Sequence, residues 1–489
     1  MKKFAFISIL AFVSISLNAQ VVINEFMASN TSIVADMVDY DDFSDWIELY
    51  NSGNENVNIS GYYLTDDLTN PNKWKIPAGA VIGANSCFLV WADGYNHGHT
   101  AQVHFFHTNF KLSADGEQIG LYDAGGNVLD TLSFGHQYSD ISYGRISDGN
   151  AQWAFFGEPT PDAPNSGLSY PNVEYAGIPE FSLPSGSYSG IQSLNIAAGA
   201  GSVIRYTTDG SRPTGSSAVF SGQIGLSHTT VVRARVFANG KIPGAIITKT
   251  YLINENTHGL PVISFTTFPE NLWDPLKGIY VNQIKEREIP IAMDYFSKDG
   301  EHVLSANAGA RLSGDASYIF PNKPFTIYAR SKYGDDFLDY PFFENREMHL
   351  FKSIYLRNSG YFDNQYTMFR DGAAHSFTQK SVQIDCQSYQ PAVMFLNGEY
   401  WGIYNIREKL NGDYFEHHYQ LDEDEIDYLK YEVNSIPVVL NGDLVEYNKF
   451  LYHVNVNLAN NDLYKKASEL IDLEEYVDYQ ISEDRKSVV

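Results

Sequence analysis

The stretch FLNGEYWGIYNIREKL, residues 395–410, carries a strong signal of local structure. Its Asn397-Gly398 dipeptide is favoured in two-residue β-hairpin turns, because both central positions of such a turn require a positive φ. The flanking runs, residues 393–396 and 400–404, are apolar and aromatic, which is typical of strands. The stretch therefore predicts a hairpin whose second strand delivers Glu408 at its end.

The composition predicts several folded domains built largely from strands. The chain has 489 residues, more than one hydrophobic core usually supports, so about three domains are expected. Its 34 Tyr, 30 Phe and 38 Gly indicate many short strands and turns. The formal net charge of −26 argues against nucleic acid or an anionic membrane as a partner, because both bind basic surfaces.

The N-terminus has the pattern of a signal peptide. Lys2 and Lys3 precede an apolar run, residues 4–17, which is too short to span a bilayer comfortably, and Ala19 offers a small residue for cleavage. Residues 1–19 are therefore predicted to be removed on secretion. No later segment of the sequence is apolar enough to cross a membrane, so we expect a protein that is secreted or held at the cell surface.

The pattern along the rest of the chain changes twice. Short alternating apolar runs predict a first β-sandwich, which ends in a linker rich in Pro and Ser. A smaller sandwich follows, with an Asp209-Gly210 turn at its centre. The third part mixes strands with helical stretches and is where we expect enzymatic chemistry. The predicted parts are a sandwich at 20–164, a linker at 165–177, a sandwich at 178–254 and an α+β domain at 260–482.

Both sandwiches carry motifs of known families. INE at 23–25, DWIELYN at 45–51 and GYYL at 61–64 make the first region similar to the lamin-tail domain, an immunoglobulin-like sandwich. IRYTTDGSRPT at 204–214 makes the second region similar to the domain at the C-terminus of chitobiases and β-hexosaminidases. Both resemblances imply accessory or adhesive modules rather than catalysts.

The third part carries a series of motifs in a fixed order. They are RLSGDAS at 311–317, PNKPF at 321–325, LRN at 356–358, Arg370-Asp371 and the opening stretch. In this order they resemble the CotH family of atypical secreted protein kinases. The resemblance implies phosphoryl transfer from ATP, with Mg²⁺, to an extracytoplasmic protein. The expected fold class is therefore multidomain: two all-β immunoglobulin-like sandwiches followed by an incomplete α+β atypical-kinase-like domain.

The resemblance also implies a nucleotide site. Phosphoryl transfer needs a glycine-containing turn near the phosphates, a lysine on the phosphate oxygens and a glutamate that holds this lysine. The candidates are Gly309, Arg311, Ser313 and Gly314 for the phosphates, with Lys323 and Glu408 as the catalytic lysine and glutamate. Each has a structural alternative: a strand turn for the glycines, an exposed turn position for the lysine, and a solvated Arg407–Glu408 ion pair.

Two further clusters suggest metal ions. Asp39, Asp41, Asp42 and Asp45 form an acidic loop that would suit Ca²⁺, but EF-hand spacing is missing and a solvated loop is favoured. His97, His99, His104 and His107 would suit zinc, but a strand would point His104 and His107 to opposite faces, so zinc is disfavoured. The metal ligands of the kinase-like domain stay unassigned.

A second class of function remains open. Two sandwiches and a strongly acidic chain also suit a non-catalytic surface scaffold, one that adheres or associates with a surface glycan. In that hypothesis the third domain is structural. Transfer of label from ATP to a surface protein would separate the two hypotheses.

The C-terminal end departs from the resemblance, which places metal ligands after a helix like that expected at 465–480. Residues 483–489 instead read as a charged tail, and DRKSVV is what a common sequencing adapter encodes. We therefore expect an artefactual tail on an incomplete chain that is itself inactive. Resequencing the locus should replace these codons with a longer reading frame; the same codons followed by a genuine stop would contradict the hypothesis.

Overall fold

The structure is a computed structural model that describes residues 20–36, 43–94, 106–314, 316–363, 366–382, 384–431, 437–455 and 460–486. Some predictions fall outside these ranges, namely those on residues 1–19, Asp39, Asp41, Asp42, His97, His99 and His104. The chain divides into two compact units, with the boundary between Val173 and Glu174. No helix in the described ranges is both long and apolar enough to span a membrane.

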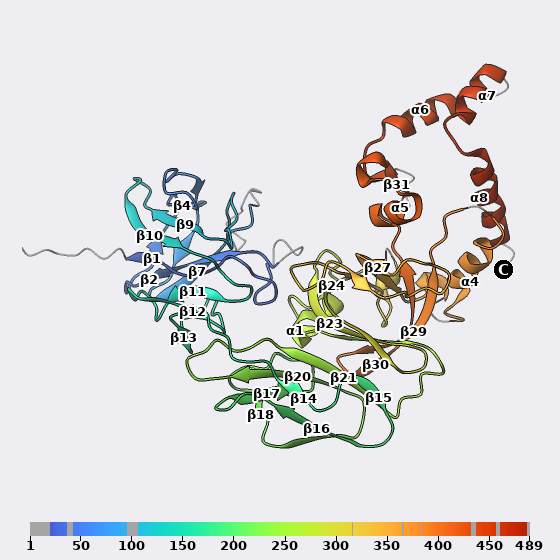
Figure 1. Cartoon of the computed structure of the whole chain (residues 1–489). Coiled ribbons are helices and arrows are strands. Elements are labelled where there is room, and N and C mark those ends of the chain that lie inside the picture. Colours follow the sequence, from blue (N-terminus) through green and yellow to red (C-terminus); the bar gives the residue numbers. More distant parts are fainter. Residues whose placement is uncertain are drawn as a thin grey trace, which may run out of the picture. The chain divides into compact units, whose positions relative to one another are not determined.

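The first unit is a β-sandwich, as predicted (Figure 1). Its larger sheet has the order β13 (Ser169–Tyr170), β12 (Trp153–Phe156), β11 (Ser142–Arg145), β1 (Val21–Met27), β2 (Trp46–Asn51), β7 (Ser86–Trp91) and β8 (Phe106–His107). The facing sheet has the order β10 (Val128–Phe134), β9 (Glu117–Tyr122), β4 (Tyr63–Thr65) and β5 (Trp74–Lys75), and β3 (Val57–Asn58) pairs with β6 (Val81–Ile82). Strand β13 lies inside the predicted linker, so this linker is partly sheet.

The second unit begins with the smaller sandwich. One sheet has the order β14 (Glu180–Phe181), β16 (Gln192–Ala197) and β19 (Gln223–Leu226). The other has the order β15 (Gly186–Tyr188), β21 (Ile247–Ile253), β20 (Thr230–Phe237), β17 (Val203–Thr207) and β18 (Ala218–Val219). The predicted turn follows β17, where Gly210 has a φ of +82° and Asp209 accepts a 3.0 Å hydrogen bond from the amide of Ser211.

The third region is a closed seven-stranded barrel (Figure 1). Around the barrel the order is β22 (Val262–Thr266), β23 (Ile289–Phe296), β24 (His302–Leu312), β25 (Phe325–Tyr328), β28 (Ser353–Arg357), β30 (Glu399–Glu408) and β29 (Tyr389–Leu396). The predicted hairpin joins β29 to β30, and both turn residues have positive φ, +50° at Asn397 and +85° at Gly398. Parallel pairing of β22 with β29 closes the barrel.

Helices and short ribbons fill out this region. Before β29 they are α1 (Pro269–Trp273), α2 (Ile279–Asn282), η1 (Ser317–Ile319), α3 (Gly360–Asp363), α4 (Arg370–Thr378) and a ribbon of β26 (Leu338–Asp339) with β27 (Leu350–Phe351). After β30 they are α5 (Gly412–Tyr419), η2 (Glu423–Glu425), a ribbon of β31 (Tyr428–Tyr431) with β32 (Pro437–Asn441), α6 (Val445–Val454), α7 (Asn461–Ser468) and α8 (Leu473–Lys486). Helix α8 continues into the predicted tail at 483–489.

The smaller sandwich and the barrel share a buried apolar cluster. Leu252 of the sandwich packs with Val262, Phe296, Val393 and Phe395 of the barrel domain. The hairpin turn is part of the same joint, because a Cβ on Gly210 would lie 2.7 Å from the Asn397 side chain and one on Gly398 3.1 Å from the amide of Val231. The smaller sandwich and the barrel domain therefore pack against each other through a buried interface.

A buried acidic network organises the first unit. Glu25 and Glu48, from the INE and DWIELYN motifs, are fully buried on β1 and β2. Glu48 accepts hydrogen bonds from the Asn24 side chain (2.9 Å) and the amide of Asp162 (2.8 Å). Glu25 accepts one from the Thr160 hydroxyl (2.8 Å). These motif residues thus hold the segment that leaves the sandwich against its central strands.

Truncating a side chain of the apolar cluster shared by the smaller sandwich and the barrel should let these two domains unfold separately. Phe395 is 1% exposed, so Phe395→Ala should cost about 3–5 kcal/mol and split one urea transition of the second unit into two. Tyr400→Ala, on the same hairpin but 61% exposed, is the matched control and should change stability little. A Phe395→Ala protein that unfolds like the control would contradict this account of the joint.

The acidic network should make the first unit less stable at higher pH. Burial raises the pKa of Glu48 from 4.5 to about 8, so the folded state holds a proton that the unfolded chain releases. The resulting stability is present below pH 4.5 and is lost as the pH rises to about 8, with a slope of at most ~1.4 kcal/mol per pH unit. Amide hydrogen exchange of β1 and β2, corrected for intrinsic rates, measures this slope. Glu48→Gln should flatten it and the exposed Glu55→Gln should not; equal slopes in both variants would contradict the prediction.

Candidate functional site

The outer face of the barrel carries a continuous row of polar side chains. Inward positions such as Phe325, Ile327 and Ile354 form the core. Because strand residues alternate between faces, their neighbours point outward. The register aligns the outward residues of four strands side by side: Arg311 on β24, Thr326 on β25, Tyr355 on β28 and Arg407 on β30.

A cavity of about 470 Å³ opens beside this row, which is within the usual size of a small-molecule site. The turn after β24 forms one side of it. The cationic side chains Arg357, Lys409 and Lys430 contribute to other sides. The remaining lining residues are Ser313, Gly314, Ala316, Ser317, Thr326, Tyr355, Gly360, Gln387, Leu410 and Tyr428.

Ser313 and Gly314 both border the cavity, as their predicted role requires. The Ser313 hydroxyl lies 2.6 Å from the Thr326 hydroxyl. Gly314 has a φ of +83°, and a Cβ there would lie 2.3 Å from the Ser317 hydroxyl, so glycine is needed for both conformation and space. The strand-turn alternative also fits Gly314, because this residue lies in the turn after β24.

Gly309 and Arg311 lie on β24 but do not line the cavity. A Cβ on Gly309 would lie 2.6 Å from a carboxylate oxygen of Glu288, so this glycine makes room for a buried acid. Glu288 in turn forms ion pairs with Arg311 (3.3 Å), Arg330 (3.0 Å) and Lys332 (3.5 Å). Arg311 is thus paired with Glu288 beside the site, and the turn interpretation of Gly309 is wrong because it lies within a strand.

Lys323 is buried, which rules out the exposed-turn alternative. It is 5% exposed, and its ammonium donates to the carbonyls of Tyr318 (2.5 Å) and Phe320 (3.3 Å). Its backbone carbonyl accepts a 2.9 Å hydrogen bond from Tyr404. Burial lowers the pKa of Lys323. In this structure Lys323 fastens the segment around η1 to the barrel.

Glu408 is also buried, so the solvated Arg407–Glu408 pair is wrong as well. Its carboxylate lies 3.1 Å from Arg346 and 2.9 Å from His418, and it accepts a 2.8 Å hydrogen bond from the amide of Ser388. Arg407, which is fully buried, pairs instead with Asp371 at 3.1 Å. Burial lowers the pKa of Arg407, and Asp371 opposes this change.

The structure does not bring Lys323 and Glu408 together. Extending the β25–β28 register two residues beyond Phe325 places Lys323 opposite Asn358, whereas Glu408 pairs with Ile354. Four strand residues separate the two levels, which is about 13 Å along the sheet. Among the described contacts of these two residues, no ion pair joins them, so the predicted lysine–glutamate pair is corrected.

Lys409 also borders the cavity, although the sequence analysis did not select it. Arg407 and Lys409 point to the outer face, and Glu408 between them points the other way. Lys409 therefore reaches the cavity, where its ammonium lies 2.8 Å from the Tyr328 hydroxyl. Alternation counted from the hairpin turn would place Lys409 on the inner face, because an extra residue at Trp401 shifts the phase of β30. Alternation counted from the core residues Tyr404 and Ile406 gives the outer face. Arg357 sits in the LRN motif, and its pairing with Asp371 at 3.3 Å is a tertiary contact without a local signal.

Comparison with protein families agrees with the three domains. A family model described as Lamin Tail Domain matches residues 15–136, and one described as Chitobiase/beta-hexosaminidase C-terminal domain matches residues 183–248. A third, described as CotH kinase protein, matches residues 310–484, which include the whole cavity. The chain carries a CotH kinase domain. No curated protein matches the chain. The lamin-tail match stops before β11 to β13, although these strands extend the same sheet.

Proposed function

We propose that the CotH kinase domain binds ATP in the 470 Å³ cavity and transfers its terminal phosphoryl group to a hydroxyl of an extracytoplasmic protein. The observation that carries this proposal is the gathering of Arg357, Lys409 and Lys430 around one cavity. In a chain with a net charge of −26, such a gathering favours an anionic ligand.

The lining residues fit a nucleotide triphosphate. Three cations would neutralise phosphate oxygens, and the Ser313-Gly314 turn lacks a side chain where the backbone must approach them. Tyr428 and Tyr355 offer aromatic surface for an adenine ring. When bound, ATP with Mg²⁺ supplies the phosphoryl group. The described lining residues include no carboxylate, so they leave the Mg²⁺ ligands unassigned.

In this proposal Lys409, Glu408 and Lys323 have different roles. Lys409 binds phosphate, and the hydroxyl of Tyr328 on β25 orients its ammonium across β28. Glu408 acts at a distance from the ligand: it anchors Arg346 and His418 at the end of β30 and so positions the strand that carries Lys409. Lys323 holds η1 in place beside the cavity through its hydrogen bond to the carbonyl of Tyr318. The sequence-based role of Lys323 on the phosphates stays a prediction, which the experiment below tests.

The alternative of a glycan-binding surface scaffold has one observation in its favour. A second cavity, of about 540 Å³, lies between the smaller sandwich and the barrel. Tyr206, Tyr400, His228 and Glu255 contribute to its lining. Aromatic faces beside polar groups are what a sugar ring would use. We propose secretion for either function, on the basis of the N-terminal pattern.

Replacing Lys409 separates the two uses of lysine in this domain. Lys409→Ala should weaken ATP binding at least tenfold, because a charge-assisted hydrogen bond contributes about 1.5–3 kcal/mol. Lys323→Ala should lower thermal stability first, since Lys323 holds two carbonyls. Lys298→Ala, at an exposed lysine paired with Glu344, is the control and should change neither. Calorimetric titration with ATP and Mg²⁺ gives the affinity, and melting curves give the stability.

Two outcomes would contradict the proposal. Lost ATP binding in Lys323→Ala at unchanged stability would return the phosphate site to Lys323. Absence of ATP binding by the wild-type chain, together with no label transfer from ATP to surface proteins, would favour the scaffold.

A further inference from the structure

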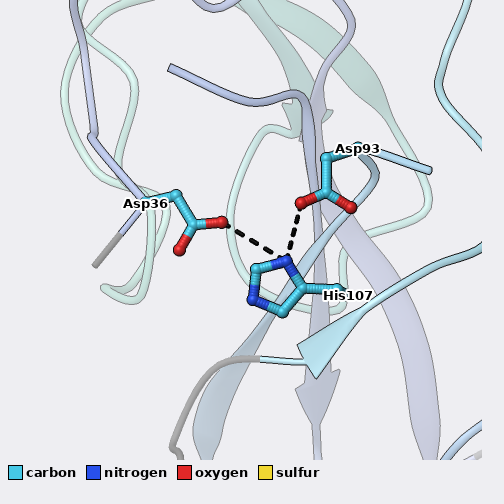
Figure 2. A group of neighbouring side chains, drawn as sticks. All are labelled: Asp36, Asp93 and His107. Atoms are coloured by element: carbon cyan, nitrogen blue, oxygen red, sulfur yellow. Dashed lines mark hydrogen bonds and ion pairs between the residues drawn. The ribbon is translucent and has the colours of Figure 1, made fainter. Parts of the chain in front are cut away.

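Three segments of the lamin-tail unit bring two carboxylates to one imidazole. Asp36 comes from the loop after β1, Asp93 follows β7, and His107 ends β8 (Figure 2). The His107 Nδ1 atom lies 3.3 Å from an Asp36 oxygen and 2.6 Å from an Asp93 oxygen. Figure 2 shows Nδ1 facing both carboxylates. One candidate ligand atom from each residue lies within 4.8 Å of the others, as shared ligands of an ion would.

Local structure holds each of the three residues in place. The Asn30 side chain donates to the carbonyls of Val34 (2.7 Å) and Ser44 (2.9 Å), which fixes the part of the loop that leads to Asp36. Asp93 forms a β-bridge with Lys111. His107 is held by parallel pairing of β8 with β7, in which it aligns with Trp91. The cluster is therefore preorganised by backbone contacts and is not a chance meeting of surface side chains.

Burial concentrates negative charge at this cluster. Asp36 is fully buried, His107 is 1% exposed and the Asp93 side chain is 7% exposed. Two carboxylates and one imidazole carry a net negative charge whether or not the ring is protonated. Removing carboxylates from water costs several kcal/mol per ion unless opposite charge or strong hydrogen bonds compensate.

We propose that Asp36, Asp93 and His107 bind one zinc ion. Imidazole nitrogen and carboxylate oxygen are both zinc ligands, with bonds of about 2.0–2.2 Å, whereas Ca²⁺ and Mg²⁺ prefer oxygen alone. Three protein ligands complete a tetrahedral site with one water molecule. The sequence analysis disfavoured zinc for a set of four histidines; the new ligand set keeps only His107 of that set and adds two aspartates.

The separations between the ligand atoms show how far each aspartate must move when zinc binds. Two ligands of a tetrahedral zinc lie about 3.4 Å apart, from bonds of about 2.1 Å. The Asp36–His107 separation of 3.3 Å has this value already. The Asp93–His107 separation of 2.6 Å is that of a hydrogen bond, so the ion takes the place of the proton between them and Asp93 moves outward by less than 1 Å. When the ring is neutral, its proton moves from Nδ1 to Nε2 as the ion binds; when the ring is protonated, one proton is released to solvent.

The function of the ion would be to fasten the sandwich. Asp36 lies in the loop between β1 and β2, whereas Asp93 and His107 lie at the edge of the sheet formed by β7 and β8. A single ion bonded to all three residues would cross-link this loop to the edge. Because zinc binds the folded arrangement, its binding free energy adds to the stability of the unit.

Zinc retention by the full chain tests the proposal. Chelator-treated protein is loaded with zinc, desalted in the presence of a weak chelator and analysed by elemental mass spectrometry and by melting. The wild-type chain should retain about one equivalent and melt at a higher temperature with zinc. His107→Ala and Asp36→Asn should each weaken zinc binding at least tenfold. Asp36→Asn preserves side-chain shape, so it remains informative if His107→Ala folds poorly.

His136→Ala is the matched control. His136 also lies near an aspartate, at 3.7 Å from Asp115, but this pair is on the surface. The control should retain zinc as the wild type does. Retention that is equal in Asp36→Asn and His136→Ala would overturn the proposal, as would a wild-type chain that keeps no zinc or that gains stability only with Ca²⁺ or Mg²⁺.

Discussion

The architecture of the second unit depends on one strand pairing, the parallel contact of β22 with β29. Each of the other neighbours in the barrel is antiparallel, so without this pairing the seven strands would form an open sheet with two free edges. Closure needs β29 to end where β22 lies, and the tight Asn397-Gly398 turn sets that end by reversing the chain within two residues. The polar row on the outer face crosses four neighbouring strands of this closed sheet, and their antiparallel registers align it.

The sequence predicted those parts of this fold that local chemistry determines. The hairpin was predictable because positive φ at two successive positions is rare outside Asn and Gly. The sandwiches followed from alternation and turn residues, and the family motifs agreed with them. The linker at 165–177 was only partly right, because two residues that pair at a sheet edge, Ser169 and Tyr170, look the same in sequence as two residues of an extended linker.

The candidate site was harder to predict, because its residues meet through sheet register. Motif order placed Lys323 and Glu408 in one domain but could not show that four strand positions separate them. Ser313 and Gly314 do line the cavity, and the turn that carries them is a local feature; their role at a nucleotide stays a prediction. Lys409 was missed, because an extra residue in β30 breaks the alternation that starts at the hairpin turn. The pairing of Arg357 and Arg407 with Asp371 joins three segments. Asp36, Asp93 and His107 also come from three separate segments, and no spacing in the sequence connects them.

The contact between two turns has a consequence for how such proteins diversify. The Asp209-Gly210 turn of the smaller sandwich lies against the Asn397-Gly398 turn of the barrel, so close that a single methyl group on Gly210 would collide with Asn397. Each domain contacts the other through one of its own hairpin turns, so neither can be replaced without changing this contact. Recombination that replaced this sandwich alone would leave the barrel with an exposed Phe395 and a turn shaped for an absent partner. In descendants of this gene the two domains should therefore be inherited as a pair, with their turn residues changing together.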